Sequence, residues 1–174
     1  MFRRGVDKGA FTLIEVIIIL FVVSVGILAS LSLVIRSSYF QNVRKELITA
    51  TFLANEGVDL MKNIRDTNIV MGRAYDDWDG SGSVGVSQNL YVVDYSTLIA
   101  SSVASISDSV LQQNTNGFYL YDIAESDSPF KRLITTNAET TASTSVEVHV
   151  QWENRGNTYD YKLKTILYDL QYSP

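Results

Sequence analysis

The longest apolar stretch of the chain runs from Phe11 to Ile35, FTLIEVIIILFVVSVGILASLSLVI, and contains one ionisable side chain, Glu15. About 20 consecutive apolar residues are enough for a helix to cross the hydrocarbon core of a membrane. The alternatives are a buried helix of a soluble protein and a cleaved secretory signal. A secretory signal has a shorter apolar region, roughly 7 to 15 residues, that ends in a small-residue cleavage site. The pattern therefore predicts a membrane-spanning helix.

Beyond Arg36 the apolar residues adopt the three- and four-residue spacing of an amphipathic helix. These apolar positions are Phe40, Val43, Leu47, Ala50, Ala54, Val58, Met61 and Ile64. No Gly-Pro break separates them from the apolar run, so we expect one continuous helix from about Thr12 to Asp66. Its apolar stripe is expected to pack on its own domain, with a coiled-coil partner as the alternative.

Strand-like runs fill much of the C-terminal part, at residues 90–95, 118–123, 130–136, 146–153 and 158–170. In the fourth run, apolar residues from Val146 to Trp152 alternate with polar ones, which is typical of a sheet with one solvated face. Residues 154–157, Asn-Arg-Gly-Asn, are expected to turn the chain between the last two runs. The predicted fold class is α+β, with the long N-terminal helix packed on an antiparallel sheet of about four strands.

Polar segments separate these runs and predict exposed connections. Residues 100–117 and 137–145 are rich in Ser, Thr, Asn and Gln, and the first is expected to contain a short helix at 101–113. Residues 126–129, Ser-Asp-Ser-Pro, predict a further turn.

Charge and composition narrow the function classes. The chain carries a net charge of −5, and its first ten residues carry +2, which leaves −7 on the remainder. This balance argues against a nucleic-acid partner. The chain has no cysteine and a single histidine, His149, on the polar phase of its strand, and it has no Gly-x-Ser-x-Gly motif. We therefore expect no enzymatic activity and no cofactor, although a carboxylate-dependent hydrolase is not ruled out by residue types.

Glu15 stands five residues into the apolar run, where a charged side chain costs up to about 2.5–3.5 kcal/mol in a bilayer. Residues 8–16, KGAFTLIEV, supply a basic leader, a small residue, Phe, three more residues, Glu and then a long apolar stretch. This segment resembles the N-terminal signature of type IV pilins and pseudopilins. In that family Gly usually precedes the Phe, whereas this chain has Ala10 there and Gly9 one position earlier.

The resemblance implies that a prepilin peptidase cuts between Ala10 and Phe11 and methylates the new amine of Phe11. It also implies that Glu15 pairs with this amine, or with that of a neighbouring subunit, and so registers subunits during assembly. Within the span, Gly26 and Ser30 at i and i+4 permit close approach between helices in lipid.

The expected organisation is a leader at 1–10, the transmembrane half of a helix at 11–35, its amphipathic half at 36–68 and an extracytoplasmic head at 69–174. The implied function is a structural subunit, a minor pilin or pseudopilin, of a type IV pilus or type II secretion filament. The alternative is a single-pass membrane-anchored extracytoplasmic binding protein or adhesin in which the motif match is accidental.

The implied partners are prepilin peptidase, other pilin or pseudopilin subunits, the inner-membrane assembly platform and, before assembly, membrane lipid. Arg3, Arg4 and Lys8 favour an N-terminus inside the cytoplasmic membrane with the head outside, although Arg36, Arg44 and Lys45 count against this orientation. After assembly the expected location is a cell-surface or periplasmic filament.

One loop carries a weak metal signal. Asp77, Asp79 and Ser81 place oxygen ligands at alternate positions, as a calcium loop does, but the twelfth position holds Gln88 in place of Glu. No other metal site is expected.

Overall fold

The computed structural model describes residues 12–82, 89–121 and 126–171. One long helix, α1 (Leu13–Val70), is followed by strands and a single turn of 3-10 helix. These later elements are β1 (Asn89–Val92), β2 (Ser101–Ser102), η1 (Ile106–Asp108), β3 (Val110–Gln113), β4 (Tyr119–Leu120), β5 (Ser126–Thr140), β6 (Ser143–Asn154) and β7 (Asn157–Tyr168). Over the described ranges, the strands form one antiparallel sheet of seven.

Local signals explain both ends of α1. At its start, the Thr12 side-chain oxygen accepts a hydrogen bond from the backbone N–H of Glu15 at 3.3 Å, which satisfies one of the free N–H groups of the first turn. At its end, Gly72 has φ +71° and donates to the carbonyl of Ile69, while Arg73 donates to the carbonyl of Asn68. This pair of bonds is a Schellman motif, which requires the left-handed backbone that glycine adopts without a Cβ penalty.

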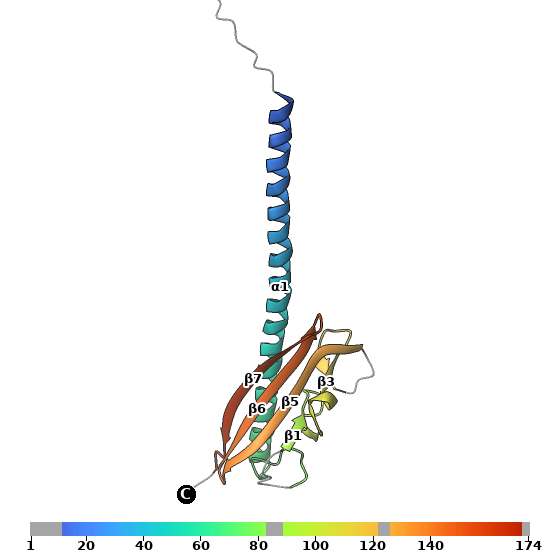
Figure 1. The fold of residues 1–174 in the computed structure, drawn as a ribbon. Helices are drawn as coiled ribbons and strands as arrows, with labels where there is room; N and C mark the ends of the chain where they lie inside the picture. Colours follow the sequence, from blue (N-terminus) through green and yellow to red (C-terminus); the bar gives the residue numbers. More distant parts are fainter. Residues whose placement is uncertain (1–11, 83–88, 122–125, 172–174) are drawn as a thin grey trace, which may run out of the picture. The chain divides into compact units, whose positions relative to one another are not determined.

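The sheet is built around β5, β6 and β7, which follow one another as hairpins (Figure 1). Since β6 pairs along most of β5, the opposite edge of β5 is shared by β3 near its start and β1 near its end. At the tip between β6 and β7, Arg155 and Gly156 have φ of 52° and 77°. Both values are positive, as a two-residue type I′ turn requires, so the predicted turn at 154–157 is confirmed.

The second half of α1 forms the core together with the sheet. Its buried residues include Leu53, Gly57, Val58, Met61 and Ile64. Against them lie the inward residues of β5 and β6, namely Phe130, Ile134, Val146, Val148, Val150 and Trp152, each at most 4% exposed. The apolar phase predicted for residues 146–152 therefore faces the core, and the predicted α+β fold is confirmed.

Several details differ from the sequence predictions. The sheet has more than the expected four strands: β1 and β4 fall at the runs predicted at 90–95 and 118–123, whereas β2 and β3 were not predicted, because two and four residues are too few to produce a clear alternation. Residues 126–129 begin β5 and do not form a turn. The helix expected at 101–113 is wrong, since only η1 is helical there and β2 and β3 flank it. The exposed connection expected at 137–145 is shorter than predicted: β5 continues to Thr140 and β6 begins at Ser143, which leaves a turn at 141–142.

The chain divides into two compact units, residues 1–44 and 45–174. The described part of the first unit is the N-terminal part of α1. The second unit contains the rest of α1 and the whole sheet.

Candidate functional site

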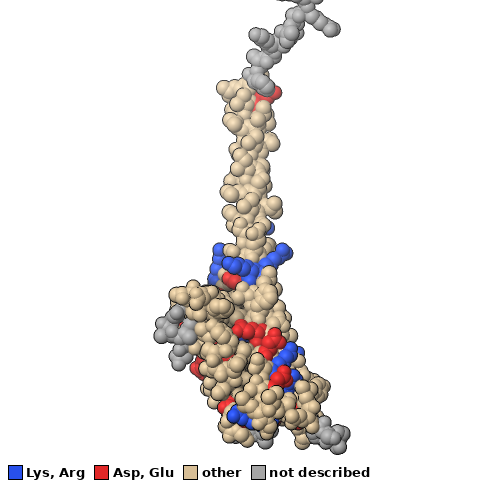
Figure 2. Space-filling model, turned by 180° about the vertical axis from the view of Figure 1, so that it is seen from behind, with Lys and Arg blue, Asp and Glu red and all other residues tan. Residues whose placement is uncertain are grey.

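The N-terminal part of α1 is exposed and apolar. It is long and apolar enough to cross a membrane, and none of the residues in its most apolar window is buried within the chain. The space-filling view shows a continuous uncharged surface on this face of the helix (Figure 2). A surface of this kind is unfavourable in water, so it requires lipid or other helices around it.

The serines of this segment are compatible with such surroundings. The hydroxyl of Ser24 donates to the carbonyl of Leu20 at 2.6 Å, that of Ser30 to Gly26 at 2.8 Å, and that of Ser32 to Leu28 at 3.0 Å. Each polar side chain is therefore satisfied within the helix and does not need water. At Gly26, an added Cβ would meet no atom beyond the adjacent helix backbone within 4 Å, so packing within the chain does not require a glycine there.

Glu15 lies in the first turn of α1, where an acidic side chain is favoured by the helix dipole. Its side chain is exposed, and no ion pair of the described residues involves it. The 20 residues from Val16 to Ile35 contain no ionisable group. Glu15 is thus the one carboxylate at the start of this apolar segment. The predicted cleavage site, Ala10 and Phe11, lies outside the described residues.

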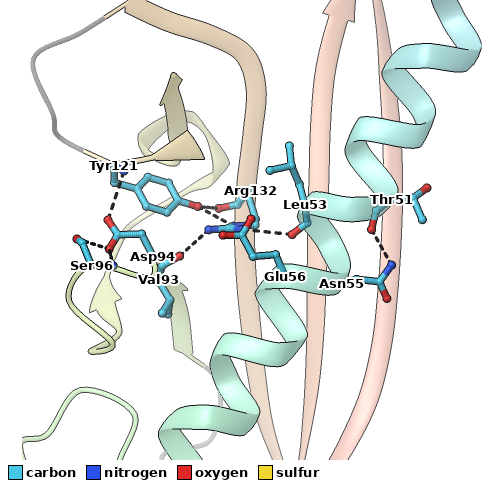
Figure 3. Close-up of polar contacts among 9 residues, drawn as sticks. All are labelled: Thr51, Leu53, Asn55, Glu56, Val93, Asp94, Ser96, Tyr121 and Arg132. Atoms are coloured by element: carbon cyan, nitrogen blue, oxygen red, sulfur yellow. Dashed lines mark hydrogen bonds and ion pairs between the residues drawn. The ribbon is translucent and has the colours of Figure 1, made fainter. Parts of the chain in front are cut away.

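In the second unit, a buried arginine joins the helix to the sheet. Arg132 of β5 is fully buried, and its Nη1 donates to the carbonyl of Leu53 at 3.2 Å and to Glu56 Oε2 at 3.0 Å (Figure 3). Its Nη2 donates to the carbonyl of Val93 at 2.7 Å. Because a buried cation is costly without partners, these bonds and the Glu56 carboxylate are what make the position tolerable.

Tyr121 completes this cluster. Its hydroxyl donates to the Arg132 carbonyl at 2.6 Å and accepts a bond from Arg132 Nε at 3.3 Å. Burial raises the pKa of Tyr121, although the neighbouring Arg132 acts in the opposite direction. The hydroxyl therefore stays protonated and remains a donor. This cluster was not predicted from the sequence, although Arg132 stands in phase with Phe130 and Ile134, which indicates that it points inward.

Two further carboxylates have structural roles. Glu46 of α1 accepts bonds from Trp152 Nε1 at 3.2 Å and from Asn154 Nδ2 at 2.6 and 2.7 Å. Asp94, which follows β1, accepts bonds from the backbone and hydroxyl of Ser96 and from the backbone of Tyr121. Burial opposes ionisation of Asp94, but these hydrogen bonds outweigh it and hold the pKa of Asp94 below its usual value.

The calcium candidate contains two acidic side chains that already bind the loop backbone. Asp77 Oδ1 accepts the N–H of Gly82 at 3.1 Å, and Asp79 Oδ1 accepts the N–H of Ser81 at 3.0 Å. The bonds from Ser81 lower the pKa of Asp79. Across the described part of the chain, no three acidic or histidine side chains converge on one point. Gln88 lies outside the described residues.

His149 and Asp160 form a pair on the polar side of β6 and β7. His149 Nε2 lies 2.6 Å from Asp160 Oδ1, which also accepts a bond from Gln151. The bond with His149 is the main cause of a lowered pKa of Asp160. His149, Gln151 and Asp160 therefore form a hydrogen-bond network on this side of the sheet.

Comparison of the chain with protein-family models, with curated proteins and with solved structures finds no match.

Proposed function

We propose that this chain is a type IV pilin-like structural subunit, a minor pilin or pseudopilin, that is processed by prepilin peptidase and polymerised through its N-terminal helix. The observation that carries the proposal is the organisation of α1. Its first part is exposed, apolar and begins with one carboxylate, while its second part is the core of a folded head. A membrane anchor alone requires the apolar residues, whereas the carboxylate makes insertion less favourable and is not needed for anchoring.

The proposed role of Glu15 is electrostatic. A charge in the apolar phase is unfavourable by up to about 2.5–3.5 kcal/mol at the centre of a bilayer, and an opposite charge offsets that cost. Cleavage before Phe11 would create an amine four residues from Glu15, and an incoming subunit would bring a second one. The attraction between carboxylate and amine then selects one axial register between neighbouring helices.

The rest of the segment supports close packing of such helices. Gly26 has open space around it, and the serine hydroxyls are satisfied internally, so another helix can approach without leaving polar groups unpaired. The proposed location is the cytoplasmic membrane, with the N-terminus inside and the head outside, and later a pilus or a secretion filament.

Substitution of Glu15 tests this role in cells that contain the matching assembly machinery. We expect Glu15→Leu to be membrane-inserted and cleaved, yet to enter filaments at least about tenfold less than wild type, which corresponds to about 1.4 kcal/mol of lost attraction. Glu15→Asp, which keeps the charge, should retain part of the incorporation. Asp59→Asn removes an exposed acidic residue elsewhere on α1 and should behave as wild type.

The measurement is the fraction of the subunit in sheared or sedimented filaments relative to the membrane fraction. Equal incorporation of Glu15→Leu and wild type would contradict the proposal and favour the membrane-anchored binding protein or adhesin.

A further inference from the structure

The helix carries exposed positive charge immediately after its apolar segment. Arg36 and Arg44, which we call the collar, are both exposed on α1. Residues 36–45, RSSYFQNVRK, contain three basic residues and no acidic one, since Lys45 follows Arg44. The ion pairs of the described residues include neither collar arginine. In Figure 2, basic atoms are visible at the level where the uncharged stretch ends.

The spacing along the helix places the collar at a membrane surface. The 20 residues from Val16 to Ile35, which have no ionisable group, span about 30 Å at a rise of 1.5 Å per residue. This length equals the thickness of a bilayer's hydrocarbon core. When Glu15 lies at one boundary, Arg36 therefore lies at the other.

Aromatic residues mark the same level. Tyr39 and Phe40 follow Arg36 by one turn, and their rings make an edge contact with centroids 5.9 Å apart. Tyrosine and tryptophan side chains are enriched in the polar layer of membranes, beside the lipid head groups. Arg44 lies about 12 Å beyond Arg36 along the axis, and side chains on a helix lean toward its N-terminus, which is the direction of the lipid.

The nearest acidic residue in the sequence forms no ion pair with the collar among the described residues. Glu46 directs its carboxylate to Trp152 and Asn154 of the β6–β7 hairpin, at distances of 2.6 to 3.2 Å. Its hydrogen-bonding capacity is therefore used within the head. The collar remains available to an anionic partner outside the chain.

We propose that the collar binds the head groups of anionic phospholipids in the leaflet where the apolar half of α1 ends. Such lipids supply phosphate oxygens at the depth of Arg36, and the guanidinium group suits phosphate because it presents a planar fork of donors. The contact would hold the unassembled subunit in the bilayer at a fixed depth. This inference rests on the membrane insertion that is part of the proposed function, and it does not depend on filament formation.

The test uses the full chain in nanodiscs that contain equal amounts of phosphatidylglycerol and phosphatidylcholine. Native mass spectrometry of the protein released from the discs counts the lipids of each kind that remain bound. We compare wild type with R36Q/R44Q and with the control K62Q/K164Q, which removes two exposed cations outside the collar. The basic residues of the first ten positions are the same in all three proteins, so their contribution cancels.

We expect wild type and the control to retain phosphatidylglycerol in preference to phosphatidylcholine. In R36Q/R44Q that preference should fall at least about fivefold, because one cation near an anionic surface contributes about that factor. In wild type the preference should weaken in high salt, because salt screens the attraction. An unchanged preference in R36Q/R44Q, or an equal fall in the control, would overturn the proposal. The yield of each protein in discs measures membrane insertion separately. A protein that does not insert can therefore be distinguished from one that inserts but has no preference for anionic lipid.

Discussion

At the scale of single residues, Gly57 sets how closely α1 approaches the sheet. A Cβ added at this position would lie 2.9 Å from Val148 Cγ1, 3.3 Å from Val148 Cγ2 and 3.4 Å from Arg132 Cδ. Val148 is β-branched and fully buried, so it has little freedom to move away. The close contact between α1 and β6 therefore depends on the missing side chain.

We predict that Gly57→Ala lowers the free energy of unfolding by about 1–3 kcal/mol through overpacking, although alanine is the better helix former. Denaturant unfolding of the detergent-solubilised chain, followed by tryptophan fluorescence, measures this change, because Trp78 and Trp152 are 5% and 3% exposed in the head. Val148→Ala makes room for the added methyl group. In the Val148→Ala background, Gly57→Ala should therefore lower the free energy of unfolding by less than it does in the wild-type protein. Fully additive effects would show that the two residues do not compete for space.

The lowered pKa of Asp94 predicts how the stability of the head changes at acidic pH. Its pKa is lowered in the folded state, so the stability that it contributes is present above its unfolded pKa of about 3.9 and is lost as the pH falls through the folded value. We expect the wild-type free energy of unfolding to decline between about pH 5 and pH 2, and Asp94→Asn to show a smaller decline. Parallel curves for the two proteins, measured by denaturant unfolding at each pH, would assign the acid sensitivity to other carboxylates such as Asp79 and Asp160.

At the scale of elements, the β6–β7 hairpin depends on its two-residue turn. Gly156 has φ +77°, and an L-residue in this region is disfavoured by about 1–2 kcal/mol. We predict that Gly156→Ala destabilises the head by about 1 kcal/mol. A thermal melt that reports a stability equal to wild type would mean that the turn changes type without affecting the twelve paired positions of the ladder.

Sequence pattern was sufficient for the long elements. The length of the apolar run predicted the first part of α1. The three- and four-residue spacing predicted the later part, and alternation predicted β6 and β7, because from Ala50 onward in α1 and in these strands burial follows the period of the backbone. The pattern failed at 137–145 because Ser143, Thr144 and Ser145 are buried although they are polar. Their hydroxyls find partners within the fold; that of Thr144, for example, lies 3.2 Å from the Tyr75 hydroxyl. The hydroxyls of Ser143 and Ser145 contact Thr140 and the Asn137 carbonyl across the β5–β6 hairpin. These contacts exist only once the two strands pair, so the local sequence pattern assigns the residues to a loop.

Glu15 and the Arg132 cluster differ in how much of each site can be predicted from the sequence. Glu15 could be identified from the sequence because its apolar surroundings are its neighbours along the chain. The Arg132 cluster could not be assembled in that way, since Leu53, Val93 and Tyr121 come from three distant segments of the chain. The phase of Arg132 within its strand indicated burial, but only the fold shows what it binds.

At the scale of the whole molecule, two compact units carry different chemistry. The first presents apolar surface with one carboxylate at its start, and the second buries the remainder of α1 under an antiparallel sheet. We interpret the first as the membrane and assembly segment and the second as the displayed head. On this account, α1 belongs to both units, so polymerisation of the first unit would carry the second unit with it.

Processing of the N-terminus tests this account most directly. The chain is expressed with and without a prepilin peptidase, extracted from membranes, and analysed by intact and N-terminal mass spectrometry. The account predicts that only the peptidase-containing sample loses residues 1–10 and begins with Phe11 bearing an added methyl group on its amine. An intact leader in both samples would contradict it and favour a membrane-anchored binding protein.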